Sequence, residues 1–131
     1  MMERVEATIT IAAGETEATV DTGYVSGLIE SIYVWAVIES SPALTVQAIE
    51  PIGTTDRIII NGVPLSGENN AIYPRTPVVD TRGTPSQFSE GFPVVERIPV
   101  YGRLKITITN GTSGDVFNIA IYLSNSNPNG R

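Results

Sequence analysis

Apolar and polar residues alternate along several short stretches of this 131-residue chain, and this alternation constrains its fold more than any other feature. It runs through residues 4–11, 103–109 and 115–123. A period of two residues is that of a half-buried β-strand, in which every second side chain faces the core. The apolar positions expected in the core are Val5, Ala7, Ile9, Ile11, Leu104, Ile106, Ile108, Phe117, Ile119, Ile121 and Leu123.

Other stretches have the length and composition of strands. Residues 16–22 form a candidate second strand, with Ala18 and Val20 facing inward and Asp21-Thr22-Gly23 ending it. Residues 28–40 are the most apolar stretch and are rich in β-branched and aromatic residues, so they are expected to form a long central strand. Two more strands are expected over residues 43–49 and 57–60.

Turn signals suggest how these strands connect. A hairpin is expected between the first two strands, at Ala12-Ala13-Gly14. A second is expected at Asn61-Gly62, because both residues tolerate positive φ. A third is expected where residues 110–114 join 103–109 to 115–123.

Together these signals define a fold class. Short strands with a turn every ten residues or so predict an antiparallel β-sandwich or barrel of about eight to ten strands. A chain of this length forms one core, so a single domain is expected over residues 1–123. Residues 124–131 are polar and predict a flexible C-terminal tail.

A proline-rich stretch interrupts this regular pattern between Tyr73 and Gly102. It holds five of the nine prolines and two of the three phenylalanines. Proline excludes a helix and lacks a backbone donor, so any strand here is expected to be short or at a sheet edge. Long irregular excursions in compact domains are usually functional or form interfaces.

The residues that carry most enzyme chemistry are scarce. The chain has no cysteine and no histidine, so thiolate and imidazole metal sites and the usual nucleophile–base pairs are excluded. Glu15, Glu17 and Asp21 offer oxygen ligands for calcium, but without an organised loop they favour a solvated strand face. We therefore expect no enzyme activity, no catalytic residue, no metal and no cofactor.

Charge and hydropathy narrow the range of partners. The net charge is −6, and no basic stripe is present, which disfavours direct nucleic-acid binding. No apolar run approaches the roughly 20 residues of a membrane helix, so no membrane is expected as a partner. Without a signal peptide at its start, the chain is expected to be synthesised in the cytoplasm.

Arginine and aromatic residues are interleaved in and beside the proline-rich stretch, a composition typical of protein–protein contacts. The alternative is a covering loop whose aromatic side chains pack on the domain. Trp35 is expected in the core or in a subunit contact, with a ligand platform as the less favoured alternative. The predicted interface residues are Trp35, Tyr73, Arg75, Arg82, Phe88, Phe92, Tyr101 and Arg103.

A resemblance to a known group rests on four segments. They occur in the order ATITIAAGETEATV (residues 7–20), IYPRTPVVDTRG (72–83), FPVVERIPVYGRLKITIT (92–109) and VFNIAIYL (116–123). In this pattern the chain resembles small virion proteins of tailed bacteriophages, the capsid decoration or cement proteins. The resemblance implies a β-sandwich or barrel, commonly a homotrimer, that binds the major capsid protein on the outside of the icosahedral shell and stabilises it.

Two other functions stay open. The chain is also compatible with another virion component, such as a head–tail connector or a tail ornament, because such folds are shared. A carbohydrate- or receptor-binding module is the other alternative. It would use Trp35 or Tyr73 as a stacking platform and should show an exposed aromatic cluster with carboxylate or amide groups nearby.

Overall fold

The protein is all-β, as the alternation predicts. A computed structural model describes residues 2–36, 41–49, 57–77, 82, 85, 87 and 95–124. Within these residues no helix has the length and hydrophobicity to cross a membrane. The strands are β1 (Met2–Thr10), β2 (Ala18–Trp35), β3 (Ala43–Ile49), β4 (Arg57–Pro64), β5 (Asn69–Ile72), β6 (Arg75–Pro77), β7 (Val95–Thr109) and β8 (Val116–Ser124).

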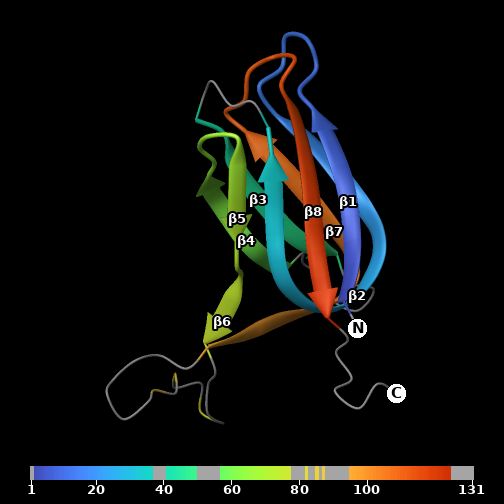
Figure 1. Cartoon of the computed structure of the whole chain (residues 1–131), viewed down its shortest axis with the longest axis vertical. Helices are drawn as coiled ribbons and strands as arrows, with labels where there is room; N and C mark the ends of the chain where they lie inside the picture. Colours follow the sequence, from blue (N-terminus) through green and yellow to red (C-terminus); the bar gives the residue numbers. More distant parts are fainter. Residues whose placement is uncertain are drawn as a thin grey trace.

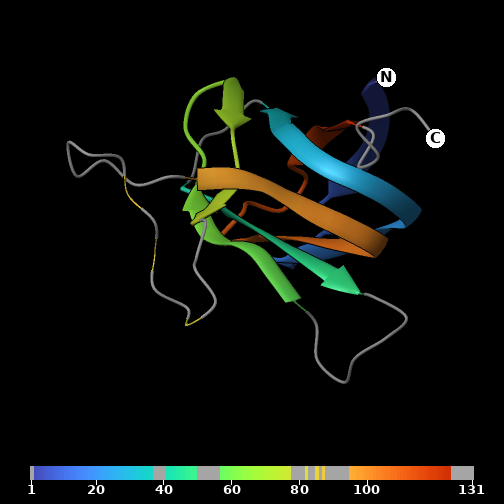
Figure 2. The same cartoon turned by 90° about the horizontal axis from the view of Figure 1, so that it is seen from below.

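The strands form one antiparallel sheet that folds back on itself without closing into a barrel (Figures 1 and 2). The order is β1-β8-β2-β7-β3-β4, with β5 on β2 and β6 on β7. The strand β2 belongs to both halves, because residues 28–35 pair with β8 and residues 18–29 pair with β7. We call β1, β8, β5 and the end of β2 the first layer. The second layer is the start of β2 with β7, β3 and β4.

The core lies between the two layers, and the strand periodicity predicted most of it correctly. The expected core positions of residues 103–109 and 115–123 are all buried, and so are Leu44, Val46 and Ala48 of β3. In β1, Ile9 is buried and Val5 and Ala7 are partly buried against the core. Alternation therefore identified the inward faces because each strand has one side against the other layer.

The predicted second and central strands are one continuous strand, β2. The prediction that Asp21-Thr22-Gly23 ends a strand is wrong, because these residues form a β-bulge: the register shifts between Asp21 and Tyr24. Gly23 has φ +81° there, and the Thr22 hydroxyl accepts a hydrogen bond from the Leu104 N–H at 3.2 Å. Residues 37–40 of the expected central strand lie outside the described residues.

Two expected hairpins are also absent from the described pairing. The strand β1 pairs with β8 and not with β2, and β8 pairs with β1 and β2 and not with β7. Both connections instead cross between the layers. The turn residues were correctly placed, but a local turn signal does not state whether the next strand pairs with the last one or crosses the core.

The two crossing loops, residues 11–16 and 110–115, bind each other. Gly111 N–H donates to the Thr16 carbonyl at 2.9 Å, and Gly114 N–H donates to the Ile11 carbonyl at 2.8 Å. The Ser113 hydroxyl donates to the Glu15 carbonyl and accepts from Gly14 N–H, both at 3.0 Å. These bonds satisfy backbone groups that a hairpin ladder would otherwise have paired.

The hairpin predicted at Asn61-Gly62 is wrong as well. Both residues lie inside β4, where the register against β3 shifts between Leu44 and Val46. Gly62 has φ +64°, and its N–H donates to the Thr45 hydroxyl at 3.0 Å. The positive φ that suggested a turn serves a β-bulge, a structure with the same backbone requirement.

The proline-rich stretch contributes two strand segments. Its start forms β6, and its end belongs to β7, which begins at Val95, before the end of the stretch. Pro99 lies inside β7. On the side of β7 away from β2, β6 pairs with residues 95–97 and β3 pairs with residues 103–109. No described strand pairs with that side of β7 at Pro99, so the missing N–H is tolerated there.

Candidate functional site

Four aromatic side chains are in contact on the outer face of the first layer. We call Tyr33, Trp35, Tyr73 and Tyr122 the aromatic cluster. Tyr33 lies at its centre, with its ring centroid 6.0 Å from that of Trp35 at an interplanar angle of 20°. Its edge-to-face contacts with Tyr73 and Tyr122 have centroid separations of 6.4 and 5.5 Å. Such pairs stabilise one another beyond the area they bury.

A second β-bulge in β2 puts this cluster on the outside. From Val25 to Ile29 the odd-numbered residues of β2 face the core, whereas after Glu30 Ile32 and Val34 do so. The register against β8 shifts between Ile29 and Ser31, which makes Glu30 the extra residue. Without it, Tyr33 and Trp35 would point into the core, so the bulge re-aims both rings.

The cluster continues onto β1 and surrounds a hollow. Arg4 and Tyr122 face each other across β1 and β8, and the guanidinium carbon of Arg4 lies 5.7 Å from the centre of the Tyr122 ring. Met2, whose side chain is 57% exposed, lines the hollow with Ser31 and three of the aromatic residues. The hollow has a volume of about 330 Å³. Tyrosine, tryptophan, methionine and arginine are the residues most enriched at protein interfaces.

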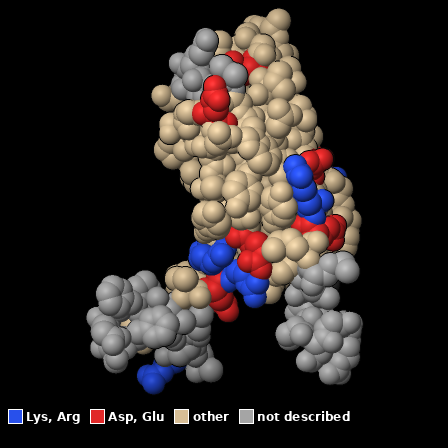
Figure 3. All heavy atoms as spheres, in the orientation of Figure 1, with Lys and Arg blue, Asp and Glu red and all other residues tan. Residues whose placement is uncertain are grey.

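Charged residues surround this face rather than cover it. In the view of Figure 3, acidic and basic groups gather at the lower end and along one side, acidic groups lie near the upper end, and the centre is largely uncharged. The Tyr73 hydroxyl lies 3.5 Å from that of Tyr33, and this contact raises the pKa of Tyr73 above 10.0. Tyr73 therefore stays neutral at physiological pH, as an apolar contact surface requires.

The predicted interface residues do not lie together. Trp35 and Tyr73 belong to the aromatic cluster. Tyr101 and Arg103 lie on the outer side of β7 in the second layer, where Arg103 is 3.4 Å from the Asp21 carboxylate and Tyr101 is 44% exposed. Tyr73 and Tyr101 both belong to the proline-rich stretch, but the sheet places them in different layers.

The remaining predicted residues lie in or beside the excursion itself. Arg75 donates hydrogen bonds to backbone carbonyls, as described below. Arg82 is exposed. Phe88 and Phe92 lie outside the described residues, so their role as contact residues stays a prediction.

Four residues of this face are not among the predicted interface residues. Tyr122 occupies the outward position of an alternating strand, so its exposure was readable from the pattern. Arg4 and Met2 belong to the first strand, but nothing in the sequence pairs that strand with β8. The sequence predicts that Tyr33 lies in a central strand, but the bulge at Glu30 that turns its ring outward has no sequence signature.

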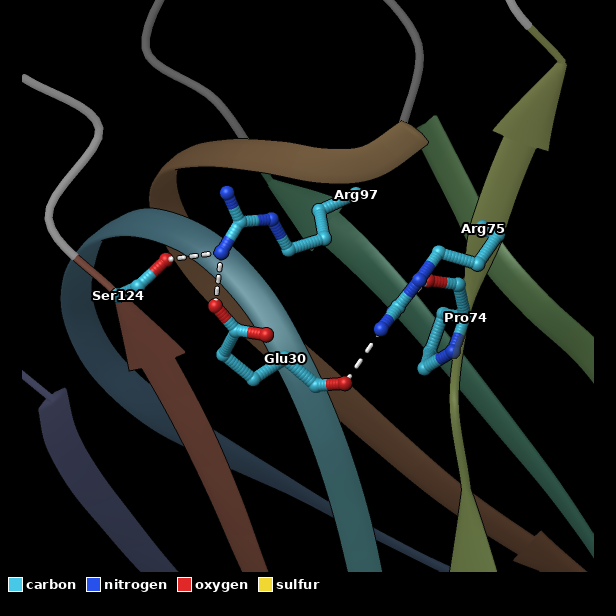
Figure 4. A network of polar contacts seen from close by, with 5 residues as sticks. All are labelled: Glu30, Pro74, Arg75, Arg97 and Ser124. Atoms are coloured by element: carbon cyan, nitrogen blue, oxygen red, sulfur yellow. Dashed lines mark hydrogen bonds and ion pairs between the residues drawn. The ribbon is translucent and has the colours of Figure 1, made fainter. Parts of the chain in front are cut away.

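A polar network secures the end of the fold where β6 meets β7 (Figure 4). Arg97 forms a hydrogen-bonded ion pair with the Glu30 carboxylate and donates to the Ser124 hydroxyl at 3.2 Å. Arg75 donates to the carbonyls of Glu30 and Pro74 at 3.1 and 2.7 Å. The network ties the bulge of β2 to both ends of the proline-rich stretch and to the end of β8.

This network predicts a pH-dependent contribution to stability. Burial raises the pKa of Glu30, but hydrogen bonds from Ser124 and Arg97 and the charges of Arg97 and Arg75 outweigh burial, so the pKa lies below 4.5. A depressed pKa gives stability that is present above pH 4.5 and is lost as the pH falls through the folded-state value. Glu30→Gln should therefore cost about 1 kcal/mol at pH 7 and less near pH 3.

Urea unfolding at both pH values measures this difference. The matched control is Glu6→Gln, which removes an ion pair with Arg4. The Glu6 side chain is 66% exposed. Its cost at pH 7 should be smaller, because exposed pairs contribute little. An equal loss for Glu30→Gln at pH 7 and pH 3 would contradict the role given to the Glu30 charge.

Comparison with known proteins adds only weak likenesses. No family model matches the chain, and no curated protein matches it. A crystal structure of FLHE is 9% identical, with a TM-score of 0.35, over 93% of this chain and 96% of that chain. A structure of infectious bursal disease virus, Gx strain, is 11% identical, with a TM-score of 0.38, over 98% of this chain and 33% of that chain. At these TM-scores neither likeness supports an argument about function.

Proposed function

We propose that this chain is a structural virion protein that binds the outside of an icosahedral phage capsid as an oligomer, with three copies expected, and stabilises the shell. The observation that carries the proposal is the aromatic cluster on the outer face of the first layer, flanked by Arg4 and Met2. Its Tyr73 is exposed, and its tryptophan and other two tyrosines are half-buried. Faces of this composition supply the few residues that dominate protein–protein binding. The four-segment resemblance to capsid decoration proteins supplies the kind of partner.

In the proposed mechanism the cluster docks on the major capsid protein. A protein that binds only the assembled shell stabilises it by mass action. When three copies are joined, each trimer engages several capsid subunits, so the second and third contacts form at high effective concentration. The tightly tied sheet brings the aromatic side chains to the shell already ordered, which lowers the entropic cost of binding.

No catalytic step belongs to this proposal. Among the described residues, no group of three or more acidic side chains is placed to hold a metal ion. The proposed role is binding, and the proposed partners are the major capsid protein and further copies of this chain.

Heating phage particles with and without this protein tests the proposal. Particles that lack it should release their DNA at a lower temperature, and adding back the purified protein should restore the higher temperature. A release temperature that does not depend on the protein would refute the stabilising role. Electron microscopy of the same particles would distinguish the alternatives, because a connector or tail ornament would lie at the portal or along the tail.

A further inference from the structure

A second hollow lies beside the aromatic cluster and differs from it in chemistry. Its volume is about 740 Å³, and Trp35 lines both hollows. The first hollow is mainly aromatic, whereas this one, the polar hollow, combines an indole with carboxylates, amides and a hydroxyl. Its principal lining residues are Trp35, Glu68, Asn69, Ser113, Asp115 and Asn118.

Sheet register places an indole between two amides. Asn118 of β8 and Asn69 of β5 are the direct neighbours of Trp35 on either side. Trp35 is half-buried and stacks on Tyr33, the residue two positions before it on β2. An indole fixed in this way offers a rigid apolar platform flanked by amide donors and acceptors.

Hydrogen bonds hold the walls of the polar hollow in place. The Ala36 N–H donates to the Glu68 carbonyl at 3.0 Å, which joins the end of β2 to the residues before β5. The Thr112 N–H donates to the Asp115 carboxylate at 3.1 Å. The Thr8 hydroxyl donates to Asn118 Oδ1 at 3.2 Å, which orients the amide and leaves Nδ2 without a partner among the described residues. Such preorganisation reduces the cost of binding a ligand.

We propose that the polar hollow is a binding site for an uncharged pyranose sugar. A pyranose ring has an apolar face of C–H groups that suits an indole, and its hydroxyl groups both donate and accept hydrogen bonds. Amides and carboxylates around the platform meet both needs. Because Glu68 and Asp115 line the hollow and no described Lys or Arg does, a sugar carboxylate or sulfate would meet like charge there.

The proposal goes beyond capsid binding, because it uses the polar hollow. Met2 and Tyr122 line the aromatic hollow, and Trp35 lines both hollows. The two activities are separable by mutation, because Asn118 lines only the polar hollow and Tyr122 only the aromatic one.

Tryptophan fluorescence tests the proposal directly, because Trp35 is the single tryptophan of the chain. The probes are the methyl glycosides of glucose, galactose, mannose and N-acetylglucosamine, titrated to roughly 50 mM, well above a millimolar dissociation constant. At least one should change the emission saturably. The matching methyl uronide, which adds only a carboxylate, should bind at least about tenfold more weakly.

Variants that keep the fluorophore locate the sugar. Asn118→Ala should weaken binding roughly fivefold or more, as expected for one lost hydrogen bond. The matched control is Asn61→Ala, an exposed asparagine of β4 in the second layer, which should leave the affinity unchanged. An unchanged Trp35 emission with all four glycosides would overturn the proposal. So would binding that is unaffected by Asn118→Ala, or a uronide that binds as tightly as its neutral counterpart.

Discussion

Gly27→Ala is expected to destabilise the protein by about 3 kcal/mol, through backbone strain and a steric clash together. Gly27 is buried in β2, where β2 passes from one layer to the other, and its φ is +144°. A Cβ atom at this position would lie 2.5 Å from the Ser124 carbonyl oxygen, which belongs to the backbone of β8 and cannot rotate away. The junction of β2, β7 and β8 therefore requires a residue without a side chain at position 27.

Gly23→Ala is the matched control for this prediction. Gly23 also has a positive φ, +81°, but a Cβ atom there would meet nothing within 4 Å. It should cost only the backbone strain, about 1 kcal/mol. Urea unfolding of both variants measures the difference. Equal stability of the two would show that the close approach of β2 to β8 is not as described.

Tyr33→Ala is expected to weaken binding to the capsid shell by about 2 kcal/mol, roughly thirtyfold. Tyr33 contacts the other three rings of the aromatic cluster, so its removal takes away a contact surface and the support of its neighbours. Co-sedimentation of the purified protein with shells lacking it gives the affinity. Circular dichroism checks that the variant is folded.

The control for Tyr33→Ala is Tyr24→Ala. Tyr24 is 68% exposed and lies on β2 in the second layer, away from the cluster. The same substitution there should leave the affinity for the shell within about twofold, as expected for a residue outside the interface. Equal losses at Tyr24 and Tyr33 would remove the distinction between the two faces on which the proposed docking rests.

The inward faces of the strands were predictable because burial on one side leaves a direct trace in the sequence. Ile106, Ile108, Phe117 and Ile119 alternate with polar residues and are fully or almost fully buried. Strand pairing was not predictable in this way. Residues 110–114 carry good turn residues, yet the chain uses them to cross between layers, because β2 occupies the position between β7 and β8.

The aromatic cluster depends on features without a local signature. One extra residue, Glu30, turns Tyr33 and Trp35 outward, and an alternating pattern cannot reveal where a bulge lies. Tyr73, which follows β5, and Tyr122 of β8 reach the cluster from segments far apart in the sequence.

The location of this chain in a reconstruction of the phage particle tests the central claim most directly. The account predicts density for the chain on the outside of the icosahedral shell, with Tyr33, Tyr73 and Tyr122 against the major capsid protein. Density at the portal or on the tail would contradict the proposed function. Density on the shell with the aromatic cluster facing solvent and the outer face of β7 against the capsid would contradict the proposed docking surface.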